Sequence, residues 1–457
     1  MKQKRSEVYK NTYKRVTALV LMINLIQQFI SVWYGKLNLM RDNYFEGKGN
    51  LLMVLFYVAL LFVLMQSIGG FKIGHNKALN VILSQTVAIF VGNAIITVQI
   101  VLMIGSLYRV KEIVWVMLGL SLTNILSCII ISFSLIFIYG KLFPPYNILI
   151  INGHYENELV PKIGTRRDKY RICEEISIDE DMDKIKEKAL QYDGVILNDI
   201  PSKEKNDLLK YCFEQSIRVY FTPKLSDIIV KGTDEVDLFD SPLFLCKKFG
   251  LSMGQRFVKR TIDIAISLVF LIIALPIILV LGICIKSYDG GSIFFIQERC
   301  TRDGKKFRMY KLRSMIENAE AEGKSIPATD DDSRITPVGK FIRKTRLDEL
   351  PQLINILKGD MSFVGPRPER VEHVEKYSLE VPEFAYRMKV KGGLTGYAQV
   401  YGKYNTSAYD KLKMDLMYIV NYSVLLDIQI VLMTIKVLFM KESTEGFKEK
   451  GEKENGK

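Results

Sequence analysis

The sequence is poor in the residues that form metal clusters or disulfide frameworks. It has three widely separated histidines, His75, His154 and His373, and six cysteines with no C-x-x-C pair among them. This spacing excludes a zinc site of the usual kind and gives no disulfide pattern. Scattered cysteines of this sort are typical of a reducing environment, so we expect the parts outside the membrane to face the cytosol.

Ionisable residues are missing from four long apolar runs in the first third of the chain. Each run is long enough to cross a bilayer; they cover residues 16–34, 50–68, 79–104 and 113–139. The first run has no small-residue cleavage site, so we interpret it as a membrane helix and not as a signal peptide. Transport paths usually contain ionisable residues, and we therefore expect the neutral polar residues of the runs to bond between helices. The cationic residues before the first run should stay inside, and four crossings return the chain to that side.

A glycine-rich dinucleotide turn is also missing, from residues 146–246. Apolar runs alternate there with helical stretches, which predicts a small parallel α/β domain of the Rossmann type; the runs begin at Tyr146, Gly194 and Ile217, and the helices cover 181–192 and 203–214. The first turn contains one glycine, Gly153, so it provides no close approach to a pyrophosphate. We expect the fold without the cofactor.

Basic residues outnumber acidic ones, but unevenly. The chain of 457 residues has a formal net charge of +13 and is 49% hydrophobic, which indicates a membrane and anionic lipid or phosphate partners; we expect no nucleic acid. Residues 146–246 carry 14 basic and 20 acidic side chains, whereas residues 247–457 carry 35 and 26. Phosphate binding is therefore predicted in the C-terminal segment.

Two adjacent carboxylates, Asp348 and Glu349, lie in that segment at the start of a predicted short helix. Leu347, Leu350, Ile354 and Leu357 recur at helical spacing, and Pro351 is tolerated only in a first turn, so the helix should begin at about residue 348 or 349. A helix N-terminus favours anions. For an isolated Asp-Glu pair the commoner role is a helix cap, so a catalytic role depends on the neighbouring motifs.

A fifth apolar run, residues 264–285, can be interpreted in two ways. Its length predicts another membrane span. Pro276 at its middle breaks the helical hydrogen bonds, and cations flank both ends, which fits a re-entrant hairpin over 259–286 that returns to the same face. The run alone leaves both open.

Several further features surround the carboxylates in the sequence. Residues 292–315 predict a β-hairpin that turns at Asp303-Gly304 and carries Lys311 and Arg313 on one face. Pro368 holds Arg367 extended, which suits bidentate binding of phosphate oxygens.

Other C-terminal stretches predict loops and surface helices. Residues 391–399 read as a flexible glycine loop open to a ligand, and Asp330-Asp331-Asp332 as a charged loop. Helices are predicted at 408–421 and 424–440, and their charged residues favour the membrane surface over a crossing. The tail, 441–457, is charged and expected to be disordered.

Taken together, residues 256–440 resemble the catalytic domain of the polyprenyl-phosphate sugar-1-phosphate transferases, the bacterial sugar transferase family. The motifs occur in order and include Lys259-Arg260-Thr261-Ile262-Asp263, Gln297-Glu298-Arg299, Tyr310–Met315, Leu347–Gln352, Lys358–Ser362, Val364–Pro368 and Gly393–Gly396. The four spans and the Rossmann-like domain resemble the long form of the family. One departure is Leu275, where members often have a serine before the proline.

The resemblance implies an activity and roles for named residues. Asp348 would attack the sugar-bearing phosphorus of a UDP-sugar, release UMP and pass the sugar phosphate to undecaprenyl phosphate, as the first step of exopolysaccharide, capsule or O-antigen assembly. Glu349 would take part and hold Mg²⁺. The diphosphate would be bound by Lys311, Arg313, Arg343 and the Pro366-Arg367-Pro368 segment. The resemblance also favours the re-entrant hairpin at 259–286 over a fifth membrane span, because a fifth span would place the site outside the cell, away from UDP-sugars.

The expected architecture therefore has three parts and a tail in a multi-pass protein of the bacterial inner membrane. We predict an α-helical membrane bundle at 1–145 and a degenerate Rossmann-like α/β domain at 146–246. An α+β catalytic domain with the re-entrant hairpin follows at 247–440, on the cytoplasmic face. Membrane lipid is a further expected partner, and the sequence leaves open whether the chain forms a homo-oligomer. One rival is a nucleotide-sugar dehydratase or epimerase, which needs the missing glycine fingerprint. A second is a non-catalytic membrane scaffold or transporter.

Overall fold

The computed structural model describes residues 2–40, 47–155, 157–246, 250–317, 319, 332–402 and 406–438. Within these ranges the chain forms two compact units, Met1–Pro223 and Lys224–Lys457. The predicted tail at 441–457, and Asp330 and Asp331 of the predicted acidic loop, lie outside the described residues.

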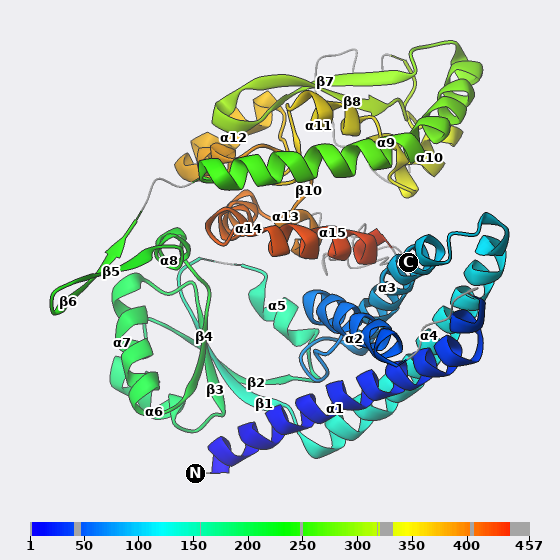
Figure 1. Ribbon diagram of the computed structural model, residues 1–457. Helices are drawn as coiled ribbons and strands as arrows, with labels where there is room; N and C mark the ends of the chain where they lie inside the picture. Colours follow the sequence, from blue (N-terminus) through cyan, green and yellow to red (C-terminus); the bar gives the residue numbers. More distant parts are fainter. Residues whose placement is uncertain are drawn as a thin grey trace, which may run out of the picture. The chain divides into compact units, whose positions relative to one another are not determined.

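Four long helices form the N-terminal part of the first unit (Figure 1). They contain the four apolar runs of the sequence, and among the described residues they and one later helix, α9, are long and apolar enough to cross a membrane. The helices are α1 (Lys2–Val32), α2 (Lys48–Ile68), α3 (Ala78–Ile104) and α4 (Val110–Leu142), with short turns η1 (Trp33–Leu37), η2 (Asn38–Met40) and η3 (Leu107–Arg109).

Neutral polar side chains join these helices, as expected from the sequence. The side-chain amide of Asn93 in α3 donates to Ser121 Oγ in α4 at 2.9 Å, and Asn124 in α4 donates to the Tyr57 hydroxyl in α2 at 2.9 Å. Since each bond joins two helices, these residues hold the bundle together, consistent with the role that we expected.

A four-stranded parallel sheet completes the first unit, in the order β2-β1-β3-β4. Hydrophobic residues pack on both faces of the sheet: helices α6 and α7 cover one face, and α5 covers the other (Figure 1). The prediction of a small parallel α/β domain is confirmed, although β2 and α5 were not predicted. The elements are β1 (Tyr146–Asn152), α5 (Leu159–Gly164), β2 (Tyr170–Ser177), α6 (Met182–Ala189), β3 (Gly194–Asn198), α7 (Ser202–Glu214) and β4 (Arg218–Phe221).

The second unit begins with a short helix and an exposed hairpin and continues into α9 (Met253–Asp289), a helix of 37 residues that includes Pro276. The first elements are α8 (Leu225–Val230), β5 (Asp234–Leu238) and β6 (Ser241–Leu245). Figure 1 shows α9 changing direction in its C-terminal part, before β7. Both parts contact the same unit: Asp263 accepts hydrogen bonds from Ser362 and from the amide of Phe363, whereas Asp289 pairs with Arg313.

The remaining elements pack around two hydrophobic clusters. The predicted hairpin is confirmed as β7 (Phe294–Cys300) and β8 (Lys306–Leu312), with the turn η4 (Arg302–Gly304) between them. The elements that follow are α10 (Pro337–Lys344), η5 (Leu347–Glu349), α11 (Gln352–Lys358), β9 (Ser362–Val364), α12 (Val371–Glu380), η6 (Pro382–Lys389), β10 (Gly393–Thr395), α13 (Tyr397–Tyr401), α14 (Ala408–Val420) and α15 (Val424–Leu438).

The prediction of a flexible glycine loop at 391–399 is wrong, because this stretch contains a strand, β10, paired in parallel with β9. A Cβ added at Gly393 would lie 2.1 Å from the amide nitrogen of Gly365. The glycine therefore allows two backbone segments of the protein to lie close together, and does not leave room for a ligand as we predicted.

The charges of the C-terminal helices also have a different cause from the one that we predicted. Asp415 lies 2.8 Å from Arg387, and Asp427 lies 2.6 Å from Lys259. Both carboxylates are buried. These charges therefore form ion pairs inside the second unit and are not evidence for a membrane surface.

Candidate active site

Asp348 and Glu349 lie in η5, a single 3₁₀ turn, and not at the start of the α-helix as predicted. The helix α11 begins four residues after Asp348, at Gln352, with Pro351 as its N-cap. Arg346, directly before η5, has a left-handed backbone with a φ of 58°, a conformation that is costly for a residue with a side chain. Leu347 and Leu350 pack against the hydrophobic cluster beneath. The turn is thus held by its leucines, and the side chains of the two carboxylates between them are largely buried, 14% and 13% exposed.

Lys311 and Arg367 bring two cations to this turn. The Lys311 ammonium lies 3.6 Å from Asp348 Oδ2 and 3.0 Å from Glu349 Oε1. Arg367 donates to the same Glu349 oxygen at 3.0 Å. Residues from β8, η5 and the segment after β9 therefore meet in one cluster, which we call the carboxylate–cation cluster: Lys311, Asp348, Glu349 and Arg367.

The two carboxylates of the cluster have opposite electrostatic environments. Burial raises the pKa of Asp348, an effect that Lys311 partly opposes. Burial acts in the same direction on Glu349, but Lys311 and Arg367 outweigh it and hold the pKa of Glu349 well below its usual range. Glu349 is therefore a fixed anion that orients the two cations. Asp348 is the more basic carboxylate, and its Oδ1 is buried with no hydrogen-bond partner among the described residues.

The segment that carries Arg367 is fixed through its backbone carbonyls. Four consecutive carbonyl oxygens accept hydrogen bonds: Pro366 from the amide of Gly393, Arg367 from the Arg387 guanidinium, Pro368 from the Arg299 guanidinium, and Glu369 from the amide of Cys300. Pro366 and Pro368 also restrict the backbone on either side of Arg367. The guanidinium of Arg367 is therefore presented from a rigid support.

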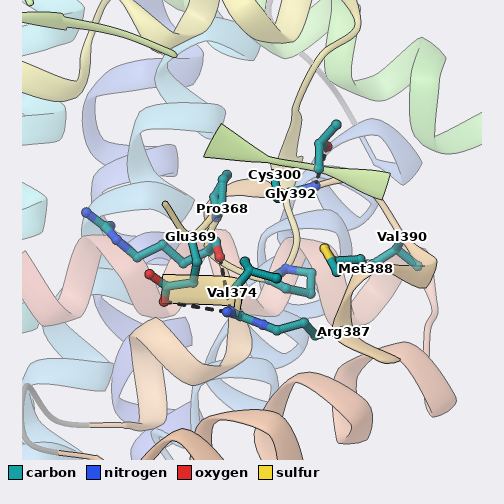
Figure 2. A pocket seen from close by; sticks show the side chains of 11 residues that line it. Cys300, Pro368, Glu369, Val374, Arg387, Met388, Val390 and Gly392 are labelled. Carbon is teal, nitrogen blue, oxygen red and sulfur yellow. Dashed lines mark hydrogen bonds and ion pairs between the residues drawn. The ribbon is translucent and has the colours of Figure 1, made fainter. Parts of the chain in front are cut away.

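Arg387 is the centre of this support and is buried beneath the segment (Figure 2). It pairs with Asp415 at 2.8 Å and with Glu369 at 3.5 Å. Figure 2 shows Glu369 and Arg387 facing each other beside a small cavity that Pro368 and Val390 also line. Sequence reasoning did not select Arg387 or Glu369. The position of Glu369 directly after Pro368 was the available signal, whereas nothing local marks Arg387.

The other predicted phosphate ligands lie apart from the carboxylate–cation cluster. Arg313 is buried and forms a two-pronged pair with Asp289 at the end of α9, with one contact at 3.0 Å. Arg343 lies in α10, and its charge adds to the hydrogen bonds from Arg334 that lower the pKa of Asp332. Among the described residues, neither arginine forms a hydrogen bond or ion pair with Asp348 or Glu349 in the structure. Their roles in substrate binding stay predictions.

The residues of the cluster fit a magnesium ion of the kind that arrives with a phosphorylated substrate. The described residues contain no group of three or more histidine, cysteine or acidic side chains that could hold a metal. Mg²⁺ usually takes only one or two protein carboxylates and completes its shell with water and substrate phosphates. The unpartnered Oδ1 of Asp348 beside the ionised Glu349 provides oxygen ligands of that type.

Comparison with known proteins identifies the family. The sequence profile of the family described as "Bacterial sugar transferase" matches residues 254–441. A Bacillus subtilis protein named as a putative undecaprenyl-phosphate N-acetylgalactosaminyl 1-phosphate transferase is 50% identical over 131 residues, which cover 29% of this chain and 73% of that protein. The chain belongs to the bacterial sugar transferase family. The matched region includes all four members of the carboxylate–cation cluster.

Longer relatives extend the similarity of this sugar transferase to other family members. A UDP-N-acetylgalactosamine-undecaprenyl-phosphate N-acetylgalactosaminephosphotransferase of Aeromonas hydrophila is 36% identical over 265 residues, covering 55% of this chain and 60% of the relative. A UDP-glucose:undecaprenyl-phosphate glucose-1-phosphate transferase of Klebsiella pneumoniae is 41% identical over 219 residues, covering 47% and 45%. The matches thus span about half of these relatives' length.

Proposed function

We propose that this sugar transferase moves a sugar 1-phosphate from a UDP-sugar to undecaprenyl phosphate, giving undecaprenyl-diphospho-sugar and UMP. The observation that carries the proposal is the carboxylate–cation cluster, in which the largely buried Asp348 lies beside Lys311, and Arg367 contacts the neighbouring Glu349. The names of the relatives from Aeromonas hydrophila and Klebsiella pneumoniae support the two substrates. The product would begin the assembly of an exopolysaccharide, a capsule or an O-antigen.

In the first step Asp348 acts as the nucleophile. One of its carboxylate oxygens forms a bond to the sugar-bearing phosphorus, and the bond from that phosphorus to the bridging oxygen breaks. UMP leaves with the bonding electron pair, and the ionised form of the carboxylate needs no proton transfer to attack. Lys311 opposes the rise in the pKa of Asp348 that burial causes, and Lys311 and Arg367 neutralise the negative charge of the diphosphate.

The second step regenerates the carboxylate. An oxygen of undecaprenyl phosphate attacks the phosphorus of the aspartyl phosphosugar, and the bond from Asp348 to phosphorus breaks. Two successive in-line displacements at one phosphorus demand accurate positioning more than acid–base chemistry. The fixed backbone around Arg367 is suited to this demand.

Glu349 and Asp348 would hold Mg²⁺, which supplies further neutralisation of the phosphate charge when it is bound. Glu349 also orients Lys311 and Arg367 through its contacts with both. This structural part of its role does not depend on the ion.

The proposed membrane arrangement places the cluster at the cytoplasmic face of the bacterial inner membrane. The contacts of both parts of α9 with the second unit, through Asp263 and Asp289, favour the re-entrant hairpin over a fifth span. The change of direction of α9 between these two contacts (Figure 1) is also what a hairpin requires and a straight span does not. UDP-sugars are made in the cytosol, so this topology gives Asp348 access to its donor.

Release of UMP from a panel of UDP-sugars tests the proposal, with undecaprenyl phosphate present and the full chain in detergent or nanodiscs. We expect release with at least one sugar and none from Asp348→Asn. A matched control is Asp360→Asn, which changes an acid of the same unit outside the cluster and should retain release. Undiminished UMP release by Asp348→Asn would overturn the assignment of the nucleophile, and no release by the wild type from any UDP-sugar would favour the non-catalytic scaffold.

A further inference from the structure

An apolar groove lies between the C-terminal part of α9 and the start of β7. It has a volume of about 310 Å³, which lies at the lower end of the range for ligand sites. Its walls are formed on α9 by Ile278, Leu279, Gly282, Ile283, Lys286 and Ser287, and on the other side by Ile293 and Phe294. The α9 wall therefore extends over about 14 Å of helix.

Gly282 lies where the two walls come close to each other. A Cβ at this position would lie 3.1 Å from Ile293 Cγ2. Glycine normally weakens a helix interior by roughly 0.5–1 kcal/mol relative to alanine. Its presence in α9 therefore lets Ile293, in the segment before β7, pack closely against the helix at this point.

The groove is apolar along its length and cationic at one end. Its first α9 residues are aliphatic, and its last two are Lys286 and Ser287. Among the residues that the structure describes, no carboxylate forms an ion pair with Lys286. The chemistry of the walls thus matches a hydrocarbon chain that ends in an anion.

The position of the groove connects the membrane helix with the catalytic turn. Ile278 and Ile293 belong to the same hydrophobic cluster as Leu347, which directly precedes Asp348. Leu279 and Ile283, on the groove side of α9, are exposed in a helix apolar enough to lie in a membrane. A lipid can therefore enter from the bilayer without leaving an apolar environment.

We propose that this groove binds the isoprenoid chain of the acceptor next to its phosphate, with Lys286 attracting the anionic end. The inference rests on the proposed function for the identity of the acceptor. It assigns chain recognition to the second half of α9 and leaves donor binding to the carboxylate–cation cluster. Filling the groove should therefore impair the second displacement and leave the first unchanged.

The experiment separates the two half-reactions in the full chain. Ile283→Trp fills the groove, and Val280→Trp is its matched control, because Val280 is also exposed on α9, 60% against 66%, but does not line the groove. We expect Ile283→Trp to raise the KM for undecaprenyl phosphate about tenfold, while single-turnover UMP release without acceptor is unchanged. Val280→Trp should change neither. An unchanged acceptor KM in Ile283→Trp, or an equal rise in Val280→Trp, would overturn the proposal.

A photolabelling measurement keeps the inference testable without turnover. We expect a polyprenyl phosphate with a diazirine in its first isoprene units to label the peptide that spans residues 278–294. Undecaprenyl phosphate should compete for this labelling, whereas dioleoyl phosphatidic acid should not. Equal competition by phosphatidic acid would show a general lipid site and contradict the assignment. If the wild type released no UMP from any UDP-sugar, the proposed function would fail, and specific labelling would still support a polyprenyl phosphate site.

Discussion

Replacing Lys311 by methionine should move the pH dependence of the first half-reaction. The Lys311 ammonium lies 3.6 Å from Asp348 Oδ2, and both side chains are less than one fifth exposed. At an effective dielectric constant of about 20, two unit charges at such a distance interact by about 4 kcal/mol, and one opposite charge typically lowers a carboxyl pKa by about one to three units. Burial raises the pKa of Asp348 and Lys311 opposes it, so removing Lys311 must raise that pKa further.

The assay is single-turnover UMP release between pH 5 and 9, in the absence of acceptor. Because the ionised carboxylate is the nucleophile, activity is lost as the pH falls through the pKa of Asp348. We expect the acid limb of the profile to move upward by at least about one pH unit in Lys311→Met and to stay in place in Lys311→Arg. Lys358→Met, a control for loss of an exposed lysine of the same unit, should also leave it in place. An acid limb at the same pH in Lys311→Met as in the wild type would refute the reasoning.

Three further substitutions probe the cluster and its support. Glu349→Gln should lower turnover by about tenfold or more and weaken its dependence on Mg²⁺, and full dependence measured in a magnesium titration would contradict the metal role. Arg387→Lys keeps a positive charge beside Asp415 but should lose the hydrogen bond to the Arg367 carbonyl. We expect kcat to fall about tenfold, as for the loss of one charge-assisted hydrogen bond, and thermal stability to change less. An unchanged kcat would exclude the positioning role. Asp348→Asn should raise the midpoint of thermal unfolding by about 2–4 °C near pH 7, because burial raises the pKa of Asp348 and makes its ionised form costly. The gain should vanish near pH 3, where the wild-type carboxyl is protonated. A lower unfolding midpoint of the variant at pH 7 would be evidence against a costly buried carboxylate at this position.

Much of the fold could be predicted from periodicity and charge. The four apolar runs and the alternation of the parallel α/β domain depend on local sequence, and the structure has both. The strand β2 was missed because its residues alternate mostly between partly buried and exposed positions and include three charges. This pattern is expected for an edge strand and differs from the continuous apolar pattern of β1 and β3. The start of α11 was placed too early because Leu347 and Leu350 fit a helical period, although Leu347 begins a separate 3₁₀ turn and Leu350 is the residue that ends it.

The candidate site could be predicted only in part. Lys311 and Arg367 come from motifs distant from the adjacent pair Asp348 and Glu349, and the structure brings Lys311 to both carboxylates and Arg367 to Glu349. Arg313 shares a strand with Lys311 but pairs with Asp289, because the end of α9 supplies a carboxylate there. Arg387 stabilises the segment from beneath through contacts with residues 20 and 28 positions away, and no spacing rule reports such tertiary contacts.

The central claim is that the carboxylate of Asp348 forms a covalent bond to phosphorus. The most direct test is intact-mass and peptide mass spectrometry of the full chain after brief incubation with a turned-over UDP-sugar and no acceptor. The account predicts one sugar-phosphate adduct per chain, located on the peptide that contains Asp348, released on addition of undecaprenyl phosphate and absent from Asp348→Asn. Turnover at full rate without an adduct on that peptide, at times when UMP is being released, would contradict it.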